Sequence, residues 1–158
     1  MSDIPTIEKR RLQAAVIKPI YEEMVESLGE AKAQQILDSA IRKAAISEAA
    51  EFAAAEPDGR TTMASFVDLY RHWTAGGALE MEILAQNDEK FDFDVTRCRY
   101  AEMYHEMGLG HIGHLMSCNR DGSFCQGYDP NIKLERAQTI MAGASRCTFR
   151  YRYEPGEG

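Results

Sequence analysis

The C-terminal part of the chain holds the side chains that could act as nucleophiles. The sequence of 158 residues contains four cysteines, Cys98, Cys118, Cys125 and Cys147, and none precedes position 98. A cysteine attacks electrophilic carbon as a thiolate, so such chemistry needs a device that removes the thiol proton. Cys118 lies in the run Ser-Cys-Asn-Arg-Asp-Gly, at the end of a predicted short helix and near a glycine, where the backbone can bend and expose a side chain. We therefore expect Cys118 to be the nucleophile.

Groups that could activate this thiol lie nearby in the sequence. They are Arg120 and the histidines His105, His111 and His114. His114 precedes Cys118 by four residues, a spacing that places two side chains on one face of a continuous α-helix. We expect His114 to assist Cys118. The competing interpretations are a buried apolar cysteine and a histidine with a structural role.

Carboxylates and arginines near the thiols could bind the charged groups of a ligand. Asp121 and Glu102 are the closest carboxylates, and either could orient a histidine or hold a cationic amidine-like group, although an aspartate exposed in a turn is the alternative. Arg150 and Arg152 alternate with aromatic residues, so a strand would present both arginines on one face. That face suits a carboxylate ligand, or it is a solvated surface.

The cysteines could also bind a metal ion. By residue type, Cys98, Cys118, Cys147 and one histidine would make a plausible zinc set. The spacing argues against it, since the cysteines are 20, 7 and 22 residues apart and no Cys-x-x-Cys pair occurs. We expect neither a metal nor a cofactor, with a cysteine-ligated zinc protein as an alternative.

Helices are predicted for the N-terminal part of the chain. Apolar residues recur at helical spacing over Ile4–Leu28, and Pro19 makes this segment either one kinked helix or two helices. The Ala-rich segment Glu30–Ala55 predicts the next helix, and a third should begin at Thr61 or Thr62 and end near residue 74. The second helix carries small residues that would let another helix approach closely, within the chain or from a second copy. These residues are Ala44, Ala45, Ala49, Ala50 and Ala53.

The pattern changes after the Gly76-Gly77 pair. Residues 79–83 and 91–95 alternate between apolar and acidic side chains around a turn, which is typical of a β-hairpin. Short helices are predicted for residues 99–107, around 111–117 and from 119, and further strands for 132–136 and 147–153. The sequence therefore predicts an α+β fold in which N-terminal helices pack on a small, mainly antiparallel sheet, with short helices inserted between strands.

Length and composition limit the classes of function. The chain is expected to form a single domain, 1–158, with a helical part over 1–75 and an α+β part over 79–153. A formal net charge of −7 would repel phosphate backbones and anionic lipids, so we expect neither nucleic acid nor membrane as a partner. We find no apolar run long enough for a membrane span and no signal-like start. We therefore expect a cytoplasmic protein with reduced thiols, which acts on a small molecule and could form a homo-oligomer.

Four segments of the C-terminal part carry a resemblance to a known family. They are Thr96–Tyr104, Gly113–Asp121, Leu134–Gly143 and Cys147–Tyr151. Together they resemble the L-2-amino-thiazoline-4-carboxylic acid hydrolase family, most clearly over residues 92–152. Cys98, Cys118, Asp121 and Cys147 occupy positions of the family pattern, whereas Cys125 is an addition.

The resemblance implies an enzyme that hydrolyses a cyclic isothiourea, the aminothiazoline ring, to an N-carbamoyl amino acid. Cys118 could attack the ring carbon between sulfur and nitrogen, or His114 could activate water for a direct attack. Asp121 or Glu102 would hold the protonated amidine, and Arg120 or Arg150 the carboxylate. The candidates are Cys118, Asp121, Cys98 and His114 for catalysis and Glu102, Arg120, Cys147 and Arg150 for substrate binding. A non-catalytic module that binds or senses a small molecule is the alternative.

Overall fold

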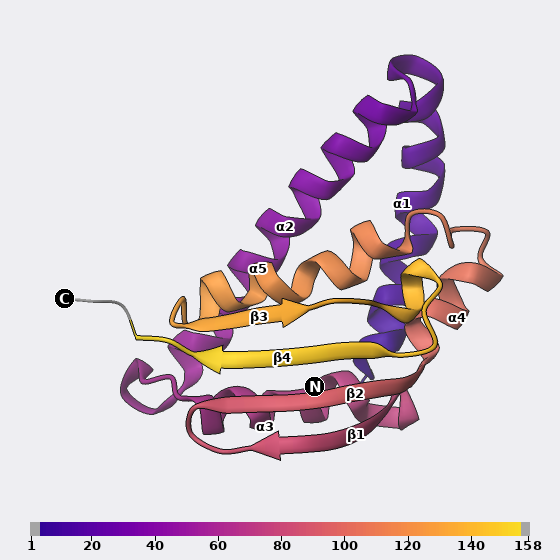
Figure 1. Cartoon of the computed structure of the whole chain (residues 1–158). Coiled ribbons are helices and arrows are strands. Elements are labelled where there is room, and N and C mark those ends of the chain that lie inside the picture. Colours follow the sequence, from indigo (N-terminus) through magenta and orange to yellow (C-terminus); the bar gives the residue numbers. More distant parts are fainter. Residues whose placement is uncertain (1–3, 156–158) are drawn as a thin grey trace.

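Two long helices form a hairpin at the N-terminal end of the chain. The computed structural model describes residues 4–155, and in it α1 (Thr6–Leu28) and α2 (Glu30–Ala55) are joined at Gly29, whose φ of 88° suits glycine. α1 continues through Pro19 as one helix, which excludes the alternative of two helices. The hairpin extends beyond the sheet (Figure 1).

The third helix starts at a capping box. In α3 (Met63–Thr74), the Thr62 side chain accepts a hydrogen bond from the Ser65 backbone N–H at 3.0 Å, and the Ser65 side chain accepts one from the Thr62 N–H at 2.9 Å. Of the two threonines considered as caps, Thr62 therefore has the role. α3 lies between the short 3₁₀ turns η1 (Pro57–Gly59) and η2 (Ala75–Gly77).

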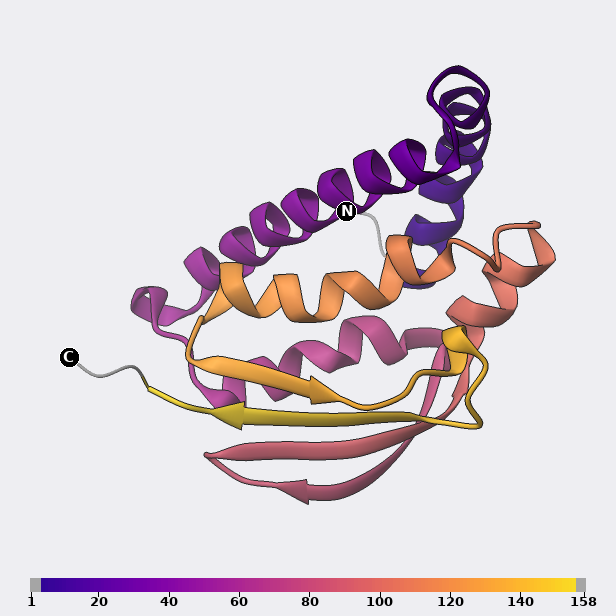
Figure 2. The same cartoon turned by 45° about the horizontal axis from the view of Figure 1, so that its top comes forward.

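Four strands form one antiparallel sheet in the order β1-β2-β4-β3. The hairpin of β1 (Leu79–Gln86) and β2 (Lys90–Cys98) lies at one edge, and β3 (Ile132–Arg136) with β4 (Cys147–Tyr153) completes the sheet. The strands predicted from alternating apolar residues are thus confirmed. α3 and α5 lie over one face of the sheet, and α2 lies beyond α5 (Figure 2).

Short helices occupy the connection between β2 and β3. α4 (Arg99–Glu106) follows β2, and a π-helical turn, η3 (His114–Cys118), leads directly into α5 (Asn119–Tyr128). A further 3₁₀ turn, η4 (Ile140–Ala142), separates β3 from β4. The predicted α+β class is confirmed, with short helices inserted between strands.

The two faces of the sheet differ in chemistry. Phe93 of β2 pairs with Phe149 of β4 and both are buried, with their rings stacked 4.7 Å apart. The alternate positions carry charges, and Asp94 on the outer face accepts hydrogen bonds from Arg150 at 3.1 Å and from Arg146 at 2.8 Å. The outer face is therefore a network of ion pairs, and the inner face is the floor of the core.

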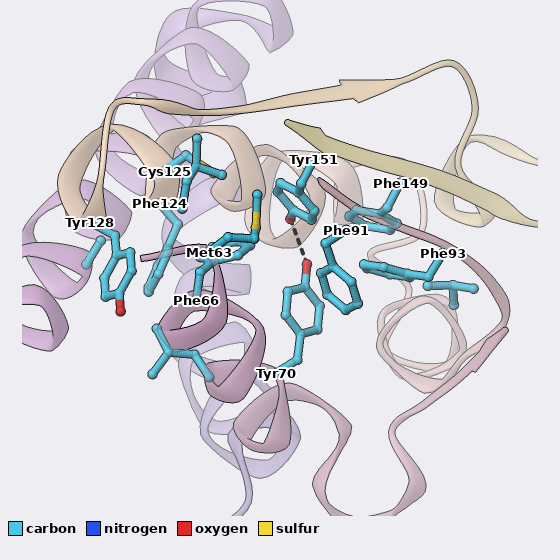
Figure 3. Packing of buried hydrophobic residues seen from close by; sticks show 14 of the residues in the cluster. Met63, Phe66, Tyr70, Phe91, Phe93, Phe124, Cys125, Tyr128, Phe149 and Tyr151 are labelled. Atoms are coloured by element: carbon cyan, nitrogen blue, oxygen red, sulfur yellow. Dashed lines mark hydrogen bonds between the residues drawn. The ribbon is translucent and has the colours of Figure 1, made fainter. Parts of the chain in front are cut away.

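Aromatic side chains fill the space between this inner face and α3 and α5 (Figure 3). The hydroxyls of Tyr70 and Tyr151 share a hydrogen bond of 2.6 Å, which satisfies two polar groups inside the aromatic cluster. A second cluster links α1, α2 and α4, and it includes Ala33, Tyr104 and Ile112.

Some of the small residues of α2 pack within the chain, whereas Ala44 and Ala50 are exposed. Ala45 and Ala49 are fully buried, and α2 packs closely against α5. At Gly127 of α5, an added Cβ would lie 2.2 Å from the carbonyl oxygen of Ile46. The two backbones can approach this closely only because position 127 has no side chain.

Within residues 4–155, no helix combines the length and apolar character that a membrane crossing requires.

Candidate active site

A cavity of about 70 Å³ lies between the sheet, the helices and the η3 turn. Five of the eight predicted site residues line it, from four different elements of the chain. They are Cys98, Cys118, Arg120, Asp121 and Cys147. The structure therefore brings together side chains that are up to 49 residues apart in sequence.

The junction of η3 and α5 positions the central thiol. Cys118 is the last residue of the π-helical turn, and Arg120 and Asp121 follow in the first turn of α5. π-helical turns inside helices are frequent at functional sites. Burial, together with the nearby Asp121, raises the pKa of the Cys118 thiol to about 12. Without a ligand, Cys118 is therefore a protonated thiol at neutral pH.

The other two cavity thiols are hydrogen-bonded to backbone. The sulfur of Cys98 accepts a hydrogen bond from the Ala101 N–H at 3.4 Å, and that of Cys147 accepts one from the Ile140 N–H at 3.2 Å. Burial raises the pKa of Cys98 to about 11 and that of Cys147 above its ordinary value. These contacts anchor both sulfurs to the ends of α4 and η4.

An ion pair joins α5 to β3 beside the cavity. Arg136 donates one N–H to Asp121 Oδ2 at 2.6 Å and another to the Cys118 carbonyl oxygen at 3.1 Å, and its guanidinium lies 5.1 Å from the centre of the Phe149 ring. Burial raises the pKa of Asp121, and the positive charges of Arg136, Arg10 and Arg120 only partly offset that effect. Asp121 is therefore a carboxyl that can exchange a proton with a group in the cavity.

Two further arginines reach the cavity, and they differ in their partners. Arg10 of α1 is 5% exposed and lies 3.5 Å from Glu48 of α2. Arg120 donates its Nε–H to the Met116 carbonyl at 2.7 Å, and within residues 4–155 it forms no ion pair. Burial and the neighbouring Arg10 lower the pKa of Arg120 to about 10, so it stays charged at neutral pH. Glu48 and Asp121 lie near enough to act on its charge, but among the described residues no carboxylate contacts the guanidinium directly, and an acidic ligand could do so.

Two further hollows, one inside the protein and one at its surface, share residues with the cavity. A space of about 20 Å³ adjoins the cavity, and Arg120 and Asp121 line both. On the outside, an open groove of about 450 Å³ is lined by Arg42, Lys133 and polar groups of α5. Cys118 and Arg136 line the groove as well as the cavity. They are therefore the wall between the interior and the surface.

Three of the predicted site residues lie elsewhere. His114 is exposed and does not line the cavity, because Leu115 and Met116 take the buried positions of the turn. His114 and Cys118 are therefore not brought together at the cavity, and a role of His114 in activating the thiol stays a prediction. Glu102 is exposed and accepts two hydrogen bonds from Arg97, at 2.9 and 3.1 Å, and this pairing lowers its pKa.

Arg150 is the third of these residues. It lies on the outer face of the sheet, where it donates hydrogen bonds to Asp94 and to the Phe93 carbonyl oxygen. The inner face of β4, which carries Cys147 and Phe149, lines the cavity instead. The arginine-bearing face of β4 was expected either to bind a carboxylate ligand or to be a solvated surface. The structure shows a solvated surface.

Several lining residues were not among the predicted ones. They include Arg10, Tyr70, Trp73, Tyr100 and Arg136. Two of them carry a signal in the sequence. Arg136 continues the inward-facing series of Ile132 and Leu134 in β3, and Arg10 lies on the buried side of α1, four residues before Ala14. A charged residue at a core position indicates a buried partner or a site.

The thiols of the cavity are not arranged as metal ligands. In the part of the chain that the structure describes, no group of three or more His, Cys, Asp or Glu side chains is placed to hold a metal ion. All four cysteines are free thiols.

Comparison with solved structures shows that this fold is shared with ligand-binding proteins. One similar structure is the phenol-responsive sensory domain of the transcription activator PoxR with phenol, at 12% identity and a TM-score of 0.57, over 89% of this chain and 74% of that one. Another is trafficking protein particle complex subunit 3 from Naegleria fowleri, covalently bound to palmitic acid. It is 12% identical, with a TM-score of 0.50, over 93% of this chain and 96% of that one. At these identities the likeness is one of fold.

Comparison by sequence identifies the family. No curated protein matches the chain. The family model described as L-2-amino-thiazoline-4-carboxylic acid hydrolase matches residues 9–151, which include every residue of the cavity wall. The match confirms the resemblance seen in the cysteine-containing segments and extends it over the N-terminal helices. The chain belongs to the L-2-amino-thiazoline-4-carboxylic acid hydrolase family.

Proposed function

We propose that this protein is a hydrolase that opens a cyclic amidine or isothiourea ring, such as that of 2-amino-thiazoline-4-carboxylate, to an N-carbamoyl amino acid. One observation carries the proposal. A protonated thiol, a carboxyl with a raised pKa and a guanidinium without a carboxylate partner line one cavity, on Cys118, Asp121 and Arg120. These groups match the electrophilic carbon, the basic nitrogens and the carboxylate of such a substrate.

Binding would use opposite charges. The substrate carboxylate pairs with Arg120, which otherwise has no anionic partner in the described part of the chain. The ring nitrogens then face Asp121, whose negative charge favours the protonated ring and so makes its carbon more electrophilic. In this role Asp121 would pair with two cations, the protonated substrate and Arg136.

The reaction would proceed in two steps that consume one water. Asp121 takes the Cys118 proton while the sulfur bonds to the ring carbon, the carbon–sulfur bond of the ring breaks, and the released sulfur receives the proton. The substrate is then attached to Cys118 as an isothiourea. Water adds to the same carbon with Asp121 as base, and the Cys118 sulfur leaves with a proton, which releases the urea product. Direct attack by water on the ring, with Asp121 as base, gives the same product.

A second candidate function is binding without turnover, and a specific observation favours it. The pKa of Cys118 is raised to about 12, and no imidazole among the described residues lines the cavity to lower it. Both solved structures of similar fold hold a small molecule, phenol in one and palmitic acid in the other. A sensor would use the same cavity and the same Arg120, with Cys118 as a wall residue.

Turnover of 2-amino-thiazoline-4-carboxylate, followed by mass spectrometry in ¹⁸O-labelled water, separates these functions. The wild type should form a product with one labelled oxygen. Cys118→Ala should lose turnover, while Cys125→Ala, a buried thiol outside the cavity, should retain it. Retained turnover in Cys118→Ala would assign the attack to water. Ligand binding by calorimetry with no product from the wild type would establish the sensor.

A further inference from the structure

An apolar stripe runs along the outer side of α1. Leu12, Val16 and Ile20 are 59%, 62% and 54% exposed. They are four residues apart, so they form one ridge along the helix. In Figure 1 the second half of α1 extends with α2 beyond the sheet, and its first half lies behind the shorter helices.

The same helix already buries its opposite side. Ala14 and Tyr21 belong to the core, with Ile17 packed against it. α1 is thus apolar on two sides, whereas a surface helix of a monomer needs only one apolar stripe. A contiguous row of exposed apolar side chains indicates a surface that associates with another molecule.

A charged residue lies at each end of the stripe. Lys9 and Glu23 are exposed on the same face, and neither forms an ion pair among the residues described. Both are seven residues from Val16, on opposite sides of it, just as Leu12 and Ile20 are both four residues away. The apolar residues of the stripe are therefore placed symmetrically about Val16. The two charged residues are also at equal distances from Val16, but their charges are opposite.

We infer that α1 pairs with the α1 of a second copy of this chain, antiparallel, around a two-fold axis at Val16. In this arrangement Leu12 of each copy meets Ile20 of the other, Val16 meets its own equivalent, and Lys9 meets Glu23 twice. A two-fold interface requires this self-complementarity. A parallel pair would instead place Lys9 beside Lys9 and Glu23 beside Glu23.

The whole helix has the charge distribution that antiparallel pairing favours. Residues 6–16, before and at the proposed axis, carry three basic residues and one acidic one, and residues 17–28 carry Glu22, Glu23 and Glu26 and one basic residue, Lys18. Each half therefore faces the opposite charge in the second copy. A single helix pair buries less than the roughly 800 Å² per partner of a standard interface, so the dimer should be reversible and should weaken with salt.

Sedimentation equilibrium of the full chain, from micromolar to millimolar concentration, tests this inference. The wild type should show a monomer–dimer equilibrium. Val16→Lys places two like charges against each other at the axis and should raise the dissociation constant at least about tenfold. Ala15→Lys is the control, because Ala15 is exposed on α1 but points about 100° away from Val16. It should leave the constant within about twofold.

Charge reversal tests the direction of the helices. Lys9→Glu and Glu23→Lys should each weaken the dimer, and the double variant, which restores two opposite-charge pairs, should recover the wild-type constant. Val16→Cys should form an intermolecular disulfide on mild oxidation, whereas Ala15→Cys should not. A wild type that stays monomeric at millimolar concentration, or a dimer unaffected by Val16→Lys, would overturn the inference. So would losses from the single reversals that the double reversal does not repair.

Discussion

Arg136 donates an N–H to the carboxylate of Asp121 at 2.6 Å, and through this pair the last residue of β3 holds the first turn of α5 against the sheet. The second guanidinium nitrogen bonds the Cys118 carbonyl oxygen. The backbone that carries the central thiol is thus fixed from the side of the sheet. Any change to the pair should affect both the stability of the fold and the position of Cys118.

Arg136→Met should destabilise the protein by about 2–3 kcal/mol at pH 7, because it leaves the Asp121 charge without its partner. The pKa of Asp121 is already raised by burial and would rise further. A carboxyl whose pKa is higher in the folded than in the unfolded protein favours the folded state at acid pH, and this contribution is lost as the pH rises through the folded-state pKa. The loss of unfolding free energy in Arg136→Met should therefore be smaller at pH 4 than at pH 7. Urea unfolding at both pH values measures it. The double variant Asp121→Asn/Arg136→Met should recover most of the stability that Arg136→Met loses at pH 7. A double variant as unstable as Arg136→Met would argue against the pairing.

Substitution of Arg120 should weaken substrate binding, and substitution of Arg150 should not. Under the proposed function, Arg120→Met removes the partner of the substrate carboxylate and should raise KM by about 10- to 100-fold. Arg150→Met changes the outer face of the sheet, where the side chain bonds Asp94, so KM should stay unchanged. Steady-state kinetics, or calorimetry with the substrate, compares the two variants. An equal effect of both would contradict the assignment of the cavity as the binding site.

The Cys118 thiol should react slowly with alkylating agents when no ligand is bound. With a pKa raised to about 12, its thiolate fraction at pH 8 is roughly a thousandfold below that of a thiol of ordinary pKa. Alkylation by iodoacetamide, followed by peptide mass mapping, should accelerate about tenfold for each pH unit from 7 to 9. Rapid labelling of Cys118 at pH 7, without unfolding, would show that a base in the protein activates it.

Two glycines of α5 should respond in opposite directions to alanine. At Gly127 a new Cβ would lie 2.2 Å from the Ile46 carbonyl oxygen, so Gly127→Ala should destabilise by about 3 kcal/mol as α2 and α5 are forced apart. Gly122 has no atom within 4 Å of the added Cβ, and Gly122→Ala should stabilise by roughly 0.5–1 kcal/mol through helix propensity. Thermal unfolding distinguishes them. Similar effects of the two variants would disprove the close contact between the helices.

The elements were predictable because their signals are local. Apolar spacing, the Gly76-Gly77 pair and the turn between β1 and β2 all act within a few residues, and the helices and strands lie where these signals place them. The convergence of Cys98, Cys118 and Cys147 was predictable from a family pattern. The alternation in β4 also showed that Arg150 and Phe149 face opposite sides, but it did not show which side is covered.

The rest of the site depends on contacts between distant parts of the chain. The exposure of His114 follows from how η3 packs, which helical spacing alone does not determine. Arg10 reaches the cavity from α1, 110 residues before Arg120 in the sequence. The position of Glu102 depends instead on a contact close in sequence, because Arg97 of the preceding strand binds it at the surface, away from the cavity.

The cavity wall takes residues from α1, α3, α4, α5 and all four strands. The complete cavity therefore exists only in the folded chain, and a ligand that occupies it would stabilise the entire fold over the unfolded chain by mass action. Proteases in a cell degrade chains mainly through their unfolded population. Under the proposed function, the abundance of this protein should therefore rise with the supply of the small molecule that occupies the cavity, because a bound chain is degraded more slowly.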